Sequence, residues 1–454
     1  MSSGFLNSSF FKPSFLIRKL QQLHSQRKYC LVFVLSLFFL QHSFAQSPTL
    51  SYANKVIDTL TSASMDGRGY VDSSDWKAAA FIQQEMKNTG LQSFSESYFQ
   101  QYALNTNVFP GTMKLNVNGT TLVAGKDFLV DAASASCKGK FNSVIINKPV
   151  ADTSLASINY LLKELSTQNN KNHFFFVPKD HFTKEQYQLW HQALHASNAF
   201  GAKGVVEFSD NKLTWDASQD QLSWCYLQVK GKLPELKKSV VTVDIESEWK
   251  KNYNTQNVIG FVKGTSMPDS FLVFTAHYDH LGQMGDGNYF PGANDNASGT
   301  SMVLNLAKYY ASHPSKYSIA FMVFSGEELG LLGSQHYVNH PLFPLGNIKF
   351  LVNLDIVGTG DEGIKVVNGT EFPLAFNQLV KLNEFKLLLK VVSPRGKAAI
   401  SDHYSFYEKG VPCFFIYTMG GIAAYHDVFD RAETLPLTDY DDLFQLLIDF
   451  AATF

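Results

Sequence analysis

The sequence predicts an α/β protein whose central sheet is covered by helices on both faces. From Asn257 onward, apolar segments alternate with helical patterns, and the apolar segments are NVIGFVKG, SFLVFTA, IAFMVFS, FLVNLDI and VPCFFIY. A strand that is apolar along its whole length needs packing partners above and below the sheet. In sheets of this kind functional groups gather beyond the strand ends, so a functional site is expected there.

Helices are predicted from the spacing of apolar residues. The spacing indicates helices over Ser301–Ala311, Pro373–Phe385 and most of Leu50–Leu91. An Asp-Gly-Arg-Gly segment at 66–69 interrupts the last of these, and Gly90 marks its end.

Residues 105–246 have a different character. Short alternating segments with many turn residues, such as MKLNVNGTTLVAG and KGVVEFS, predict a β-rich inserted domain. The main domain is then expected to comprise residues 46–104 and 247–454.

The first 45 residues are expected to be a secretory signal. Four basic residues between 18 and 28 precede the apolar run Cys30–Leu40, and Ser43-Phe44-Ala45 provides a small-x-small cleavage site. The run is too short for a comfortable transmembrane helix, although an uncleaved anchor is the alternative. The expected location is therefore secreted or periplasmic, with no stable membrane partner.

Composition limits the possible partners. The chain has 454 residues, 45% of them hydrophobic and 17% charged, with a net charge of −2. These values are typical of a large globular core and not of a disordered chain. No basic run lies outside the N-terminus, which argues against nucleic acid.

Three cysteines remain beyond the signal. They allow one internal disulfide at most, and Cys137–Cys225 is the favoured pair because both lie in the inserted region. Cys413 lies in the apolar segment VPCFFIY and is expected to be a small buried hydrophobe. A serine triad is not favoured, because the sequence contains no Gly-x-Ser-x-Gly.

Five metal-binding side chains lie near apolar runs: His277, Asp295, Glu328, Asp355 and His426. Two imidazoles and three carboxylates suit two Zn²⁺ ions that share one carboxylate. Three carboxylates also offset most of the four positive charges, so that the set can lie in a cleft. The pattern predicts a hydrolase with a two-metal centre.

These segments resemble the co-catalytic zinc exopeptidase family, which includes leucine-type aminopeptidases, glutamate carboxypeptidases and glutaminyl cyclases. The resemblance extends from Asn257 to Thr434, and five motifs in one order are far more specific than any one of them. It implies a mixed central sheet sandwiched by helices. The inserted piece ASNAFGAKGVVEFSD resembles a protease-associated domain, while an unrelated insert remains the alternative.

The resemblance also implies how the metals are divided. His277 and Asp355 would hold one zinc, Glu328 and His426 the other, and Asp295 would bridge them.

The residues beside the ligands suggest the remaining chemistry. Adjacent loop residues point different ways, so Glu328 can bind metal while Glu327 acts as general base on the activated water. Asp279, two residues after the first ligand, can accept from its free imidazole N–H. Tyr425, next to the last ligand, is a candidate donor to the developing oxyanion.

Asp402 and His403 lie in AISDHYSFYEKGVP, which resembles a family segment near the substrate pocket. They are candidates for a role behind the metal ligands or at the substrate. The alternative is ordinary capping of the following helix.

The function best supported at this level is a metal-dependent aminopeptidase acting on peptides with a free N-terminus. A glutaminyl cyclase would usually bind one zinc, which fits the five-ligand set less well. A carboxypeptidase would need a basic pocket, to which Arg395 and Lys397 are candidate contributors. A catalytically inactive binding protein is disfavoured by the intact Glu327 and ligand set.

Overall fold

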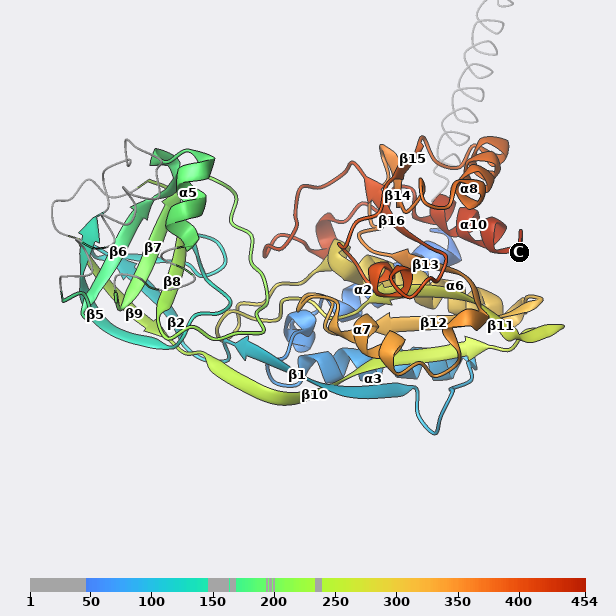
Figure 1. Cartoon of the computed structure of the whole chain (residues 1–454), viewed down its shortest axis with the longest axis horizontal. Helices are drawn as coiled ribbons and strands as arrows, with labels where there is room; N and C mark the ends of the chain where they lie inside the picture. Colours follow the sequence, from blue (N-terminus) through green and yellow to red (C-terminus); the bar gives the residue numbers. More distant parts are fainter. Residues whose placement is uncertain are drawn as a thin grey trace, which may run out of the picture. The chain divides into compact units, whose positions relative to one another are not determined.

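The protein is built on two eight-stranded sheets, both visible in Figure 1. The computed structural model describes residues 46–145, 163, 169–192, 195, 198, 201–232 and 239–454. Residues Thr49–Phe454 form one compact unit. The predicted signal in residues 1–45 lies outside the described part.

The first sheet is mixed, as expected. In sheet order the strands are β1 (Phe99–Val108), β10 (Glu248–Val262), β12 (Tyr317–Phe324), β11 (Met267–His277), β13 (Ile348–Leu354), β16 (Cys413–Met419), β14 (Gly363–Val367) and β15 (Val392–Arg395). The central strands β12, β11, β13 and β16 run parallel to one another, whereas β1 pairs antiparallel with β10, β10 with β12, and β14 with β16.

Helices cover both faces of this sheet, which confirms the predicted α/β sandwich. The helices are α2 (Pro48–Leu60), α3 (Ser74–Thr89), α6 (Gly299–Ser312), α7 (Leu332–Asn339), α8 (Pro373–Lys386), α9 (His403–Tyr407) and α10 (Tyr440–Ala451). In β12, Ile319 and Phe321 belong to a core cluster with buried residues of α3, α6 and α10, whereas Ala320 and Met322 belong to a second cluster with residues of α7 and α9. Alternate side chains of a strand point to opposite faces, so a fully apolar strand stabilises both layers.

The second sheet comes from the region expected to be β-rich. Its core includes buried phenylalanines of adjacent strands, such as Phe176 and Phe208. In sheet order its strands are β3 (Thr120–Leu122), β2 (Met113–Val117), β9 (Val240–Ile245), β5 (Cys137–Ile145), β6 (His173–Pro178), β7 (Gly204–Ser209), β8 (Cys225–Lys230) and β4 (Phe128–Val130), and α5 (Lys184–His191) lies between β6 and β7 in the chain. Strand β1 continues to Val108, paired with Glu248, and the domain boundaries stay a prediction.

The favoured disulfide is not present. Cys137 and Cys225 are both buried free thiols, and they contact each other through a side-chain hydrogen bond. The sequence argument therefore chose neighbouring residues, but they are not linked. Cys413 is fully buried, as expected.

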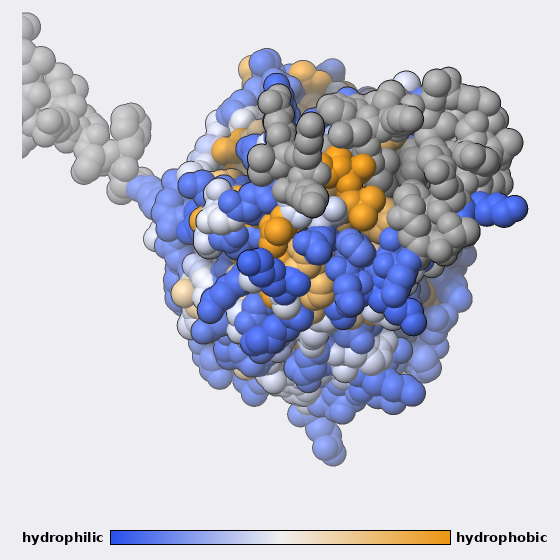
Figure 2. All heavy atoms as spheres, turned by 90° about the vertical axis from the view of Figure 1, so that its left-hand side faces the viewer, coloured by the Kyte–Doolittle hydropathy of each residue, from blue (hydrophilic) through white to orange (hydrophobic). Residues whose placement is uncertain are grey.

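The surface carries most of the charge. Figure 2 shows a largely hydrophilic face on which a few apolar side chains are grouped near the centre. Among the described residues, no helix is both long enough and apolar enough to cross a membrane.

Candidate metal centre

The predicted ligands meet beyond the ends of the central parallel strands. His277 ends β11, Asp355 follows β13 directly, and Glu328 lies in the turn after β12. Asp295 lies in the segment that leads into α6, and His426 lies in the long loop after β16. Parallel strands finish at one edge of a sheet, so the fold itself collects these side chains.

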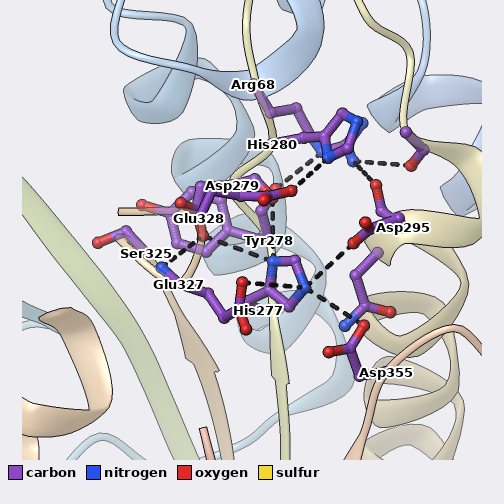
Figure 3. Close-up of polar contacts among 12 residues, drawn as sticks. Arg68, His277, Tyr278, Asp279, His280, Asp295, Ser325, Glu327, Glu328 and Asp355 are labelled. Atoms are coloured by element: carbon purple, nitrogen blue, oxygen red, sulfur yellow. Dashed lines mark hydrogen bonds and ion pairs between the residues drawn. The ribbon is translucent and has the colours of Figure 1, made fainter. Parts of the chain in front are cut away.

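The carboxylate of Asp295 points toward the imidazole of His277 (Figure 3) and also faces that of His426. Its Oδ1 is 3.3 Å from Nε2 of His277, and its Oδ2 is 3.2 Å from Nε2 of His426. Asp355 Oδ1 is 3.3 Å from the same nitrogen of His277, and Glu328 Oε2 is 3.2 Å from that of His426. The five residues therefore lie together, and the Asp295 carboxylate faces the imidazoles of both His277 and His426. How they would divide two metal ions stays a prediction.

The electrostatics of this cluster suit a cation. Burial alone would lower the pKa of His277, but Glu327 and Asp355 raise it well above the ordinary value. Burial would raise the pKa of Asp295, yet the neighbouring imidazoles His277 and His426 hold it well below its usual range. In the described part of the chain, no lysine or arginine forms an ion pair with the three carboxylates. The donor set thus fits metal ions, which carry the positive charge that the side chains lack.

His280 is a further member that the sequence analysis missed. Its Nδ1 is 2.6 Å from Oε1 of Glu328, and with Glu328 and Asp295 it forms a second possible metal-binding group beside that of His277, Asp295 and Asp355. The signal was present in the HYDH segment, where a second histidine follows the first by three positions. Glu328 therefore contacts two imidazoles, those of His280 and His426.

Asp279 and Glu327 lie together beside the first ligand. The backbone oxygen of Asp279 is 3.1 Å from Nδ1 of His277, closer than its carboxylate at 3.6 Å. The carboxylate instead accepts from the Tyr70 hydroxyl at 3.0 Å and from the backbone N–H of Glu327 at 3.3 Å. Glu327 Oε2 is 4.0 Å from Nε2 of His277, and burial raises the pKa of Glu327 well above its usual range. Glu327 is therefore placed at the cluster and positioned through Asp279.

Two buried charges brace the loops that carry the ligands. Arg68, from the Asp-Gly-Arg-Gly segment, is fully buried, and burial lowers its pKa to about 10. The carboxylate of Asp430 accepts from the backbone N–H groups of Asn294 and Asp295. The guanidinium of Arg68 donates to the backbone oxygens of Leu60, Tyr278, Pro291, Gly292 and Asp295. Both side chains form hydrogen bonds with backbone groups. Backbone groups are common to all residues, so no local sequence pattern indicated this role for Asp430.

A buried polar chain stands behind Asp355. Ser401 Oγ donates to Asp355 Oδ2 at 2.7 Å. Asn353 donates to Ser401 at 2.8 Å, and Thr275 donates to Asn353 at 2.6 Å. Each hydroxyl and amide is satisfied, so the carboxylate has a defined orientation.

The neighbouring Asp402 and His403 are fully buried. Asp402 occupies the N-cap position of α9, but its side chain makes no capping hydrogen bond, so the structure does not support the capping alternative. Burial raises the pKa of Asp402 to about 7 and lowers that of His403 to about 3. Their role behind the ligands stays a prediction.

Tyr425 lies at the rim. Its ring stacks on that of His426, with centroids 4.0 Å apart, and the residue is 45% exposed. The ring therefore packs on His426, while the role of the hydroxyl as an oxyanion donor stays a prediction.

Fold and site together define an α/β protein with two groups of side chains that could each hold a metal ion and that share Asp295. Residues 257–451 match the model of peptidase family M28. The aminopeptidase YwaD of Bacillus subtilis strain 168 is 30% identical over 252 residues, which cover 54% of this chain and 51% of YwaD. A probable zinc metalloprotease of Pyrenophora teres f. teres strain 0-1 is 35% identical over 125 residues, 26% of this chain and 25% of that protein. The chain thus matches about half of the length of YwaD and a quarter of the fungal protein.

Solved structures share the fold over most of the chain. BSAP, a zinc aminopeptidase from Bacillus subtilis, superposes with a TM-score of 0.65 at 20% identity, covering 89% of this chain and 94% of that one. An aminopeptidase from Aneurinibacillus sp. strain AM-1 gives 0.60 at 18% identity, covering 88% and 92%. At these identities the likeness shows the fold alone.

Proposed function

We propose that this protein is a zinc-dependent aminopeptidase that removes N-terminal residues from peptides. The observation that carries the proposal is Asp295, which presents one carboxylate oxygen to each of two ligand imidazoles. The family match and the aminopeptidases among relatives and structural neighbours support it. The signal-like residues 1–45 support a secreted or periplasmic location.

Two zinc ions fit the donor set. His277 and Asp355 would hold one, Glu328 and His426 the other, and Asp295 would bridge them. When bound, such ions act as Lewis acids that activate water and polarise the scissile carbonyl.

The protein's own residues would handle the protons. Glu327 would take a proton from the attacking water and pass it to the leaving amine, because its carboxylate is at the cluster yet absent from both ligand groups. Asp279 would position this base through its bond to the Glu327 backbone. The Tyr425 hydroxyl would donate to the oxyanion that develops on the carbonyl.

The substrate's N-terminus is the end we propose to be bound. A free α-ammonium would find carboxylates in this cluster, with a charge-assisted contact that a blocked terminus lacks. The basic residues that a carboxypeptidase would require, Arg395 and Lys397, are both exposed, and Arg395 bonds to the Tyr417 hydroxyl. Their exposure favours aminopeptidase over carboxypeptidase.

A substrate panel tests the assignment. Chelation should abolish hydrolysis of a free peptide by the purified protein, and Zn²⁺ should restore it. Acetylation of the peptide's N-terminus should lower kcat/KM sharply, whereas amidation of its C-terminus should change it little. The reverse pattern would assign a carboxypeptidase, and release of ammonia from N-terminal glutamine without cleavage would assign a cyclase.

Replacement of the base gives an independent check. Glu327→Gln keeps the side-chain shape but cannot accept the proton, so kcat should fall by about 10²–10⁴-fold with zinc still bound. Glu384→Gln, an exposed position on α8, is the matched control and should be unchanged. A Glu327→Gln protein with normal kcat and full zinc would show that another group is the base.

A further inference from the structure

A segment from the region of the second sheet reaches the metal ligand His426. Residues 212–216 follow β7 in the chain, and we call them the clamp segment. The backbone N–H of Trp215 donates to the backbone oxygen of His426 at 2.9 Å. In return, the Trp215 oxygen lies 2.8 Å from Nδ1 of His426 and accepts its proton. One backbone unit therefore binds both the main chain and the side chain of the ligand.

These contacts determine which nitrogen faces the metal. Because a backbone oxygen can only accept, Nδ1 of His426 carries a proton, so Nε2 is the nitrogen left to bind a metal ion. Nε2 faces Asp295 and Glu328, each 3.2 Å away. The carboxylate of Asp216, 3.1 Å from Nδ1, is a second acceptor for the same proton.

The ligand's own loop does not provide this support. His426 has a φ of 50°, in the left-handed region that side chains rarely adopt. Lys212 reaches across to the same loop, where its ammonium donates to the backbone oxygens of Ala423 and Tyr425 and pairs with Asp427 at 2.7 Å. The clamp segment therefore holds the loop on both sides of His426.

The clamp segment is itself held in place by contacts of the Trp215 side chain. The Trp215 indole N–H donates to the backbone oxygen of Val130 at the end of β4, at 2.6 Å. Its ring stacks on Phe290, with centroids 4.6 Å apart, and Phe290 precedes Asp295 in the loop that carries the bridging carboxylate. Trp215 thus joins the second sheet to two ligand-bearing loops.

We propose that Lys212, Trp215 and Asp216 are positioning residues of the metal site, so that the second sheet's region is part of the metal centre and not a separate appendage. This inference rests on the proposed function for the identity of the metal. Metal binding and docking of the clamp segment then stabilise one another, because linkage between two equilibria is reciprocal.

Zinc affinity tests the proposal without any turnover. In competition with a chromophoric chelator, the double variant Lys212→Met/Asp216→Ala should bind its weaker zinc about 10–100-fold less tightly, the range for loss of a ligand's hydrogen-bond partners. Lys212→Arg, which keeps the charge and donors, should restore most of the loss caused by Lys212→Met. The matched control is Lys230→Met/Asp220→Ala, at exposed positions in the same region, and it should bind zinc as wild type does.

Hydrogen exchange gives the reciprocal measurement. Zinc should slow exchange in the wild-type peptide that contains 212–218, and the double variant should lose most of that protection. Unchanged zinc affinity together with zinc-independent exchange would overturn the proposal, and so would a wild-type protein that binds no zinc. A wild type that binds zinc but cleaves no peptide would refute only the proposed function, since both clamp measurements would still apply.

Discussion

The two imidazole ligands are held in different ways. His277 ends strand β11; its ring Nδ1 faces the backbone oxygen of Asp279 two residues on, and its own backbone oxygen accepts from Thr300. His426 lies well beyond the end of β16, and its ring depends on Trp215, which is 211 positions away in the chain. His277 is therefore positioned by the sheet, whereas His426 is positioned by a contact between residues far apart in the chain.

The two halves also differ in burial. The side chain of His277 is 1% exposed and that of His426 is 10% exposed. In the half that contains His277, the buried Ser401 donates a hydrogen bond to Asp355. The half that contains His426 is bordered by the exposed carboxylate of Asp216 and the half-exposed ring of Tyr425. We therefore expect the zinc held by His277 to bind more tightly than the one held by His426.

The largest effect on stability is expected from replacing Arg68, which forms hydrogen bonds with loops on both sides of the site. Arg68→Met would leave buried backbone oxygens in the loops after β11 and before α6 without donors. The free energy of unfolding should fall by on the order of 3–5 kcal/mol, the cost of losing a buried charged donor, as measured by urea denaturation. Arg431→Met, at an exposed position, should change it by less than ~0.5 kcal/mol. A loss of zinc from one half alone would show that Arg68 is not a common support.

The next effect separates the two possible roles of Tyr425. Tyr425→Phe keeps the ring that stacks on His426 but removes the hydroxyl. If the hydroxyl stabilises the oxyanion, kcat should fall by about 10²–10³-fold while zinc affinity stays unchanged. Tyr425→Leu, which also removes the stacking, should lower zinc affinity as well. Normal kcat in Tyr425→Phe would restrict this residue to packing on the ligand.

The smallest effect sharpens the contrast between the halves. Ser401→Ala removes the donor to Asp355 and should weaken the zinc shared with His277 by about tenfold. Exchange of the peptide 212–218 should not change, in contrast to the clamp variants. Ser312→Ala, on the exposed end of α6, serves as the control. Faster exchange at 212–218 in Ser401→Ala would show that the two halves are not independently positioned.

The fold and the five candidate ligands could be inferred from the sequence because both inferences depend on local patterns. A fully apolar strand such as Ile319–Phe324 can be recognised from its own residues, and so can the polar residues that directly follow it. Helix ends were also legible: Gly90 has a φ of 82° and closes α3, as the sequence indicated.

Other members of the site had no such signal. Asp430 accepts from a backbone N–H of Asp295, and Trp215 contacts the His426 ring through its own backbone oxygen. Every residue has these backbone groups, so no residue type in the sequence marks such a contact. His280 lies in the same HYDH segment as His277, but its contact with Glu328 depends on how two separate loops approach each other. The proximity of Cys137 and Cys225 was inferred from their common region, whereas the state of the thiols depends on the distance and geometry between the strands.

The sequence by itself determined the layered architecture, the strand ends that carry the chemistry and the residue types able to bind metal. It did so because burial and hydrogen bonding impose periodic patterns on residues that are neighbours in the chain. Only the tertiary structure decided that Asp295 faces both imidazoles, that Arg68 braces both loops and that the clamp segment orients His426. Those contacts join residues far apart in the chain, and their geometry exists only once the packed core has brought the loops together.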